Sequence, residues 1–222
     1  MIKLTLSEAY EFVRKSLDEL AMTDDLGASA YKEDKDLYEI VRSTIEEVTL
    51  DVHQQAPAVL VDGLTSRVAL NNENDTDAVI TEYDEENGGI VKLTMAVDTA
   101  RIVSIHSSDS DIIVTELLAE DSAEAHKQNN KFLRGTPDSP RAVLLKYAED
   151  KKPQVKYYTI KEQHKDSYMQ VEYIPYPVIE DDAVWISWQL YYPVLNWLVA
   201  AVLEILNEAE KAQLWKSKFK TE

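Results

Sequence analysis

The hydrophobic period of the sequence changes twice along the chain, and this change constrains the fold more than any other feature. Apolar residues recur at helical spacing up to residue 57, alternate with polar residues over 58–177, and form a helical run again after residue 190. Periods of 3.6 and 2 residues are typical of amphipathic helices and half-buried strands. Helices and strands that are segregated along a chain favour the α+β class. We therefore predict an α+β fold.

Two amphipathic helices are expected at the start of the chain, forming a helical hairpin. The first has an apolar stripe that begins at Leu6 and ends at Leu20, and Thr5 or Ser7 is suited to its N-cap position. The second is predicted over residues 36–55, because Ala56-Pro57 ends its pattern.

A single long helix is expected at the end of the chain, over residues 193–218. Its first half is apolar on most sides, whereas its second half, from Asn207, is amphipathic and charged. A helix that is apolar all round must be covered by protein, but a polar continuation is free to project. We therefore expect the second half to extend away from the core.

The middle of the chain is predicted to be antiparallel and rich in β-strands, with short connections. Asn87-Gly88-Gly89 between two alternating runs is typical of a β-hairpin. One short helix is expected within this region, over residues 122–133. We assign residues 58–177 to this β-rich domain, and 1–57 with 178–222 to a helical core. The remaining strands are expected at residues 101–106, 111–117, 141–147, 155–160 and 168–174.

The composition argues against several classes of protein. Twenty-three basic and 41 acidic residues give a formal charge of −18, which disfavours an independent nucleic-acid binder or a protein that docks on anionic lipid. The absence of cysteine excludes disulfides, thiolate metal sites and a cysteine nucleophile. The most hydrophobic run, residues 190–203, is too short for a membrane span and is interrupted by Pro193 and Asn196. We expect no membrane association and no cleaved leader.

Little in the sequence indicates catalysis. The four histidines, at positions 53, 106, 126 and 164, have no metal-ligand spacing, and we predict that they are polar residues of the surface or of strand edges. The acidic run at 71–77 is interpreted as a solvated turn rather than a calcium loop. No metal or cofactor is expected, and we predict that the chain is not an enzyme. A soluble α+β enzyme or small-molecule binding module stays open as the alternative, because 41 acids always offer carboxylate pairs.

Aromatic residues are concentrated before and within the last helix. Such a cluster is expected either in the core, where the sheet meets the helix, or in an interface with another subunit, where aromatic residues are enriched. The sequence leaves both interpretations open. The five residues, which fall within 13 positions, are Trp185, Trp188, Tyr191, Tyr192 and Trp197.

The order of these elements resembles a known family. Two opening helices, a β-rich middle, a strand that ends in a proline-containing run and a closing helix are similar to the head-to-tail adaptor proteins of tailed phages. The similarity is greatest to those of short-tailed phages, including the crAss-like group. The segments that carry it are 4–14 (LTLSEAYEFVR), 52–57 (VHQQAP), 135–137 (GTP), 141–148 (RAVLLKYA), 171–177 (VEYIPYP), 190–201 (LYYPVLNWLVAA) and 210–215 (EKAQLW).

The resemblance implies a structural protein of the virion, assembled in the host cytoplasm, with no catalytic residues. Members of the family form a closed homo-oligomeric ring, commonly of twelve copies, on the portal protein. They bridge it to further tail or neck ring proteins, and packaged DNA passes through without specific binding. A tail-tube or other neck component is the alternative within the virion. The family's terminal helix often contacts the portal, which assigns that role here to Lys211, Leu214, Trp215, Lys218 and Phe219.

The physical features of the sequence agree with a ring. Head-to-tail contacts require two different patches on each subunit, and the helical hairpin and the last helix are candidates to supply them. A charge of −18 keeps free subunits soluble through self-repulsion. If the acids line a channel, they also repel DNA phosphates; if they coat the outside, they do not.

Overall fold

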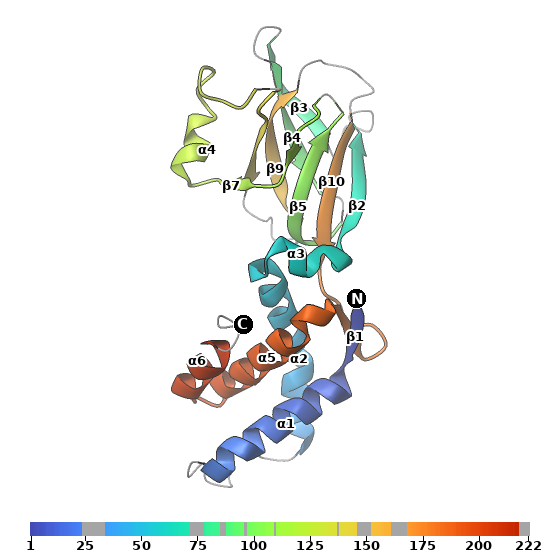
Figure 1. Cartoon of the computed structure of the whole chain (residues 1–222), viewed down its shortest axis with the longest axis vertical. Coiled ribbons are helices and arrows are strands. Elements are labelled where there is room, and N and C mark those ends of the chain that lie inside the picture. Colours follow the sequence, from blue (N-terminus) through green and yellow to red (C-terminus); the bar gives the residue numbers. More distant parts are fainter. Residues whose placement is uncertain are drawn as a thin grey trace. The chain divides into compact units, whose positions relative to one another are not determined.

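The computed structural model describes residues 1–23, 34–71, 78–84, 88–95, 97–108, 110–136, 138–145, 152–160 and 168–217 (Figure 1). It contains helices at both ends of the chain and antiparallel sheets between them, so the predicted α+β class is confirmed. The chain divides into two compact units. Unit 1 comprises Met1–Leu64 with Pro177–Glu222, and unit 2 is Thr65–Tyr176. The first junction falls later than residue 57 because residues 58–64 form short helical turns within unit 1.

The helical hairpin of unit 1 follows the apolar stripes of the sequence. Helix α1 begins with a capping box, in which the Glu8 amide donates to the Thr5 hydroxyl at 3.2 Å and the Thr5 amide donates to the Glu8 carboxylate at 3.0 Å. The bond from the Thr5 amide is the main reason why the pKa of Glu8 lies below its ordinary value. The helical elements of this half are α1 (Leu6–Thr23), α2 (Asp34–Gln55), α3 (Ala58–Val61) and the 3-10 turn η1 (Asp62–Leu64).

A two-stranded sheet in unit 1 was not predicted from the sequence. Strand β1 (Ile2–Thr5) pairs antiparallel with β11 (Ala183–Ile186), from the other end of the chain. Asp181 and Asp182 precede β11 with φ of 51° and 55°, the left-handed conformation that a two-residue turn requires at both of its central positions. Glu180 and Ala183 exchange backbone hydrogen bonds across this turn. The acidic segment at residues 180–182 therefore forms a tight turn that leads into a strand.

The prediction of one long C-terminal helix is wrong, because the segment breaks at Asn207. Asn207 has φ of 63°, and its amide donates to the Glu204 carbonyl while the Glu208 amide donates to the Leu203 carbonyl. These two bonds form the Schellman motif that ends many helices. The break separates helix α5 (Tyr191–Ile205) from helix α6 (Ala209–Ser217). A short 3-10 turn, η3 (Trp188–Leu190), precedes α5.

Helix α6 folds back against α5 and does not project. The Lys216 ammonium lies 2.8 Å from the Glu204 carboxylate and 5.7 Å from the centre of the Trp197 ring. Ala212 is fully buried and Trp215 is only 9% exposed. The charged half of the predicted helix is thus part of the unit 1 core, contrary to expectation.

The break at Asn207 gives a first testable prediction. Substituting Asn207→Ala is expected to lower the free energy of unfolding by about 1 kcal/mol, because a residue with a Cβ is strained at positive φ and alanine lacks the local hydrogen bonds of asparagine. Asn207→Gly is the matched control and is expected to be neutral or stabilising. Urea denaturation followed by circular dichroism measures both changes. Equal effects of the two substitutions would contradict the left-handed conformation.

Unit 2 is a sandwich of two sheets with one shared core. Alternate residues of both sheets meet in this core, among them Leu93, Ile105, Tyr157 and Val171, all at most 1% exposed. The first sheet has the order β2 (Ser66–Asn71), β10 (Tyr168–Pro175), β5 (Thr99–Ser107), β6 (Ile113–Val114). The second has the order β3 (Ala78–Asp84), β4 (Gly88–Thr94), β9 (Gln154–Ile160), β8 (Arg141–Leu145), β7 (Leu117–Ala119).

Two details of unit 2 differ from expectation. The strand predicted over residues 111–117 is divided, since β6 pairs with β5 in one sheet and β7 pairs with β8 in the other. The β7–β8 pairing is also parallel, whereas the other described pairings are antiparallel. A chain that crosses between the sheets of a sandwich must interrupt its strand, and this accounts for the division.

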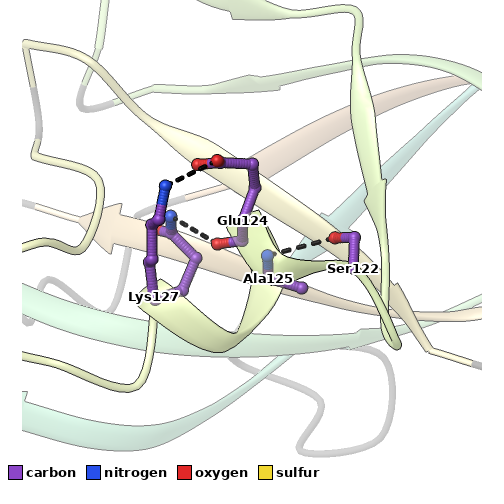
Figure 2. Close-up of polar contacts among 5 residues, drawn as sticks. Ser122, Glu124, Ala125 and Lys127 are labelled. Carbon is purple, nitrogen blue, oxygen red and sulfur yellow. Dashed lines mark hydrogen bonds and ion pairs between the residues drawn. The ribbon is translucent and has the colours of Figure 1, made fainter.

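The helix predicted over residues 122–133 is much shorter than expected. Helix α4 (Ala123–Lys127) makes little more than one turn and is followed by turns up to Arg134. Ser122 caps it by accepting a hydrogen bond from the Ala125 amide at 3.1 Å, and Lys127 pairs with Glu124 at 2.6 Å (Figure 2). Ala125 packs against the outer face of the second sheet, on Ile90, Val143 and Tyr158.

Candidate functional site

The aromatic cluster, for which core and interface both stayed open, is divided between buried and exposed positions. Trp197 is 8% exposed and belongs to the unit 1 core. Trp188 and Tyr192, in contrast, are 67% and 64% exposed. Trp185 lies in β11 beneath the Lys3 ammonium, 5.1 Å from its ring centre, and remains 40% exposed. Tyr191 is half-buried and meets Tyr192 edge to face at 5.3 Å. Part of this cluster is therefore available to another molecule.

The residues assigned to portal docking are not one surface. Trp215 is buried, and Lys211 is half-buried 3.6 Å from Glu208. Leu214 is 61% exposed on α6. Lys218 and Phe219 lie outside the described residues. Within the described part of this set, Leu214 is the apolar side chain that a partner can reach, and the docking role itself stays a prediction.

A groove in unit 1 runs between α2 and α5, and we call it the α2/α5 groove. Its volume is about 360 Å³. Apolar side chains of Val48, Ala201 and Ile205 line it together with Trp197. Ile205 is 53% exposed, which is unusual for a large aliphatic residue next to a core tryptophan. The other lining residues are polar: Thr44, Glu47, Asp51, Glu204 and Lys216. Three carboxylates against one ammonium give the groove an acidic rim.

A second groove in unit 1 follows α1, and we call it the α1 groove. It has a volume of about 490 Å³. Phe12 and Tyr191 supply its aromatic surface. Burial is the main cause that raises the pKa of the Tyr191 hydroxyl above its ordinary value. The remaining lining residues carry charges of both signs: Glu8, Glu11, Arg14, Lys15 and Asp18.

A polar cleft lies in unit 2 beside α4, and we call it the α4 cleft. It has a volume of about 420 Å³ and mixes Arg134 and Arg141 with Glu116 and Glu124. Glu124 already pairs with Lys127 (Figure 2). Gln128, Leu118, Leu133, Gly135, Thr136 and Ser139 complete the lining. None of these residues forms the nucleophile, base and orienting set that hydrolytic chemistry requires.

The turns that follow α4 expose an unusual apolar tip. Phe132 is 94% exposed and its neighbour Leu133 is 59% exposed. We call residues 129–134 (NNKFLR) the Phe132 loop. Sequence analysis missed this feature, because a helix was expected there and a pattern of residue types does not report exposure. The one available signal was a locally basic run, with Lys131 and Arg134, in a strongly acidic chain.

The prediction that the histidines are surface or strand-edge residues is wrong for His53. His53 is 2% exposed on α2, and neither ring nitrogen has a hydrogen-bond partner; the hydroxyl of Thr49, one turn earlier, also lacks one. Burial lowers the pKa of His53 from 6.5 to about 4. The Nε2 of His106 donates a hydrogen bond to the Ser110 carbonyl oxygen at 2.9 Å. His164 and the acidic run at 72–77 lie outside the described residues.

His53 gives a prediction about pH. Because its folded pKa lies below its unfolded pKa, the unfolded chain binds the proton first as the pH falls from 6.5 towards 4, and stability is lost in that window. Between pH 7 and pH 5 the expected loss is about 2 kcal/mol. All four tryptophans belong to unit 1, so their fluorescence during urea denaturation reports this loss.

The controls for this effect are two histidine variants. In His53→Leu the loss between pH 7 and pH 5 should shrink by about 2 kcal/mol relative to the wild type. His126 is exposed, and His126→Gln should retain the full loss. A His53→Leu variant with the wild-type pH dependence would show that His53 is protonated equally in both states.

Among the described residues, no group of three or more histidine or acidic side chains is placed to hold a metal ion, and no helix is long and apolar enough to span a membrane. Comparison with known proteins gives no relative: no family model matches the chain, and no curated protein matches it.

Proposed function

We propose that this protein is a structural subunit of a phage virion, which forms a closed ring at the junction of head and tail. In this role it bridges the portal to the tail and surrounds the channel through which DNA leaves. The proposal begins from the resemblance of the element order to head-to-tail adaptors. The observation that carries it furthest is the presence of separate exposed apolar surfaces on the two units. Trp188 and Tyr192 lie on unit 1, and Phe132 with Leu133 lies on unit 2.

A ring component needs several different surfaces, for its two neighbouring copies and for the proteins above and below the ring. A subunit in a ring touches one neighbour with one patch and the other neighbour with another, so the contact is heterologous and closes by rotation. Exposed tryptophan, tyrosine and phenylalanine side chains are typical of the centres of such contacts. Phe132, at 94% exposure, adjoins the exposed Leu133, and contiguous exposed apolar side chains favour an interaction surface.

The charge of the chain fits passage of DNA. With a formal charge of −18, repeated copies around a channel repel phosphates and form no tight contacts with them. DNA then moves through without being held. If acids are instead confined to the outer surface of the ring, the charge serves solubility alone.

Imaging of the purified protein with and without portal protein from the same virus tests the proposal. We expect monomers alone and rings when portal particles are present, seen by negative-stain microscopy and by co-sedimentation. Absence of both ring and portal binding would contradict the proposal. Rings that form only on tail proteins would instead identify a neck or tail-tube component.

The alternative from a different class is a small-molecule binding module or enzyme, for which the α4 cleft is the candidate site. Its mixed charges favour a zwitterionic ligand. Such a protein would be a fixed small oligomer whose melting temperature rises with ligand. The portal experiment and a thermal-shift screen with amino acids therefore separate the two classes.

A further inference from the structure

We infer that neighbouring copies are joined by insertion of the Phe132 loop of one copy into the α2/α5 groove of the next. This inference rests on the proposed function, because it specifies the contact that would hold the ring together. The loop belongs to unit 2 and the groove to unit 1, so each copy carries one of each.

The Phe132 loop is built to present its phenylalanine in a fixed conformation. The side chain of Gln128, itself 5% exposed, accepts a hydrogen bond from the Gly135 amide at 2.7 Å and so ties the two ends of the loop together. Within the loop, Asn130 accepts hydrogen bonds from the amides of Phe132, Leu133 and Arg134. An anchor that is already ordered loses little entropy on binding.

The position of Gly135 adds to this rigidity. A Cβ at residue 135 would lie 2.8 Å from the Arg141 amide nitrogen and 2.9 Å from the Tyr158 carbonyl oxygen. The backbone therefore approaches strands β8 and β9 more closely than any other residue type allows. The loop leaves the sheet at a defined point, and Phe132 stands out from it at 94% exposure.

The α2/α5 groove fits this loop better than the other two hollows do. Its apolar residues Val48, Ala201 and Ile205 suit an aromatic ring, and its acidic rim suits the basic residue Lys131 next to the tip. The α1 groove is less acidic than the α2/α5 groove, because Arg14 and Lys15 offset two of its three carboxylates. The α4 cleft contains the loop's own Leu133 and Arg134, so it is unsuited to receive the same loop from another copy.

This pairing is heterologous, as the contacts of a ring are. The two surfaces are different and lie on different units, so each copy can give a loop to one neighbour and accept a loop from the other. Such a head-to-tail contact forms a ring when the rotation from copy to copy closes, and a filament otherwise. It leaves Trp188, Tyr192 and Leu214 for contacts with the proteins above and below the ring.

Disulfide trapping tests the contact, and the cysteine-free sequence makes it specific. A chain with Phe132→Cys and Ala201→Cys, assembled on portal particles and oxidised, should give a ladder of linked copies on non-reducing gels. A chain with Val59→Cys and Ala201→Cys is the matched control and should give none, because Val59 is 75% exposed but lies outside both surfaces. Linkage within single chains only would overturn the inference in favour of a loop that fills its own groove.

Loss of assembly supplies an independent measurement. Phe132→Glu should weaken association of copies by roughly 30-fold or more, as expected for loss of a central aromatic anchor. Glu47→Lys should weaken it less, and Lys131→Glu in the same chain should restore it. Val59→Glu should have no effect. Rings formed equally well by Phe132→Glu would refute this contact and leave the proposed function intact, whereas failure of the unmodified protein to form rings would contradict both.

Discussion

Substitution of Trp197 with alanine is expected to lower the free energy of unfolding of unit 1 by about 3–5 kcal/mol. Trp197 is 8% exposed on α5, in a helix whose neighbouring residues Leu198, Val199 and Ala200 are fully buried. Its ring also lies beneath the Lys216 ammonium at 5.7 Å, which links α5 to α6. Alanine would leave a cavity where α5 and α6 meet, and the surrounding helices cannot fill it by small shifts. Since the total stability of a domain is about 5–15 kcal/mol, we expect much of the variant to be insoluble in cells.

The matched control is Trp188→Ala, which removes the same side chain from a position that is 67% exposed. We expect a change within about 0.5 kcal/mol, because no core contact is lost. Urea denaturation followed by circular dichroism measures both variants, and fluorescence of the three remaining tryptophans confirms which unit unfolds. Equal stabilities of the two variants would show that Trp197 contributes to an interface rather than to the core.

The elements that sequence analysis predicted well are those with long, regular patterns. The stripe from Leu6 to Leu20 predicted α1, and of the two N-cap candidates, Thr5 and Ser7, the structure selects Thr5. The pattern over residues 36–55 likewise predicted α2. A stripe repeated over five turns identifies a buried face without knowledge of its partner, since burial of that face provides most of the stability of a helix.

The elements that were missed depend on partners distant in sequence or on single residues. Strands β1 and β11 have four residues each and pair with each other across nearly the whole chain. The helix break depends on Asn207 alone. Asparagine is the residue after glycine that most often adopts the left-handed conformation at a helix end, so this signal was present in the sequence and outweighed by the continuous apolar pattern.

The candidate site was only partly predictable for a related reason. Hydrophobic patterns identify side chains that seek burial but do not distinguish burial in the same chain from burial in an assembly. Trp188 and Trp197 are therefore alike in sequence, although one is exposed and the other is core. His53 could have been found, because Ile45, Thr49 and His53 lie four residues apart on one face of α2, and all three are buried.

Truncation after Asn207 is expected to destabilise unit 1 by at least the effect of removing Trp215, about 3–5 kcal/mol. Helix α6 contributes Ala212 and Trp215 to the core at 0% and 9% exposure, and its loss also uncovers the apolar side of α5. Removal of a projecting helix, which the charge pattern suggested, would have left the free energy of unfolding of unit 1 unchanged. Solubility on expression and urea denaturation of the truncated chain measure the difference. A truncated chain as stable as the full one would mean that α6 does not pack on α5.

The packing of α6 on α5 changes how docking of the C-terminal segment must be tested. A truncated chain that fails to bind portal would be uninformative, because unit 1 itself would be unfolded. Leu214→Asp is the better variant, since Leu214 is 61% exposed on α6 and its neighbour Trp215 is buried. We expect Leu214→Asp to keep the wild-type stability, and Trp215→Ala to lower the free energy of unfolding by about 3–5 kcal/mol. If Leu214→Asp still co-sediments with portal particles at wild-type levels, the portal contact lies elsewhere on unit 1, and Trp188 with Tyr192 is then the surface to change next.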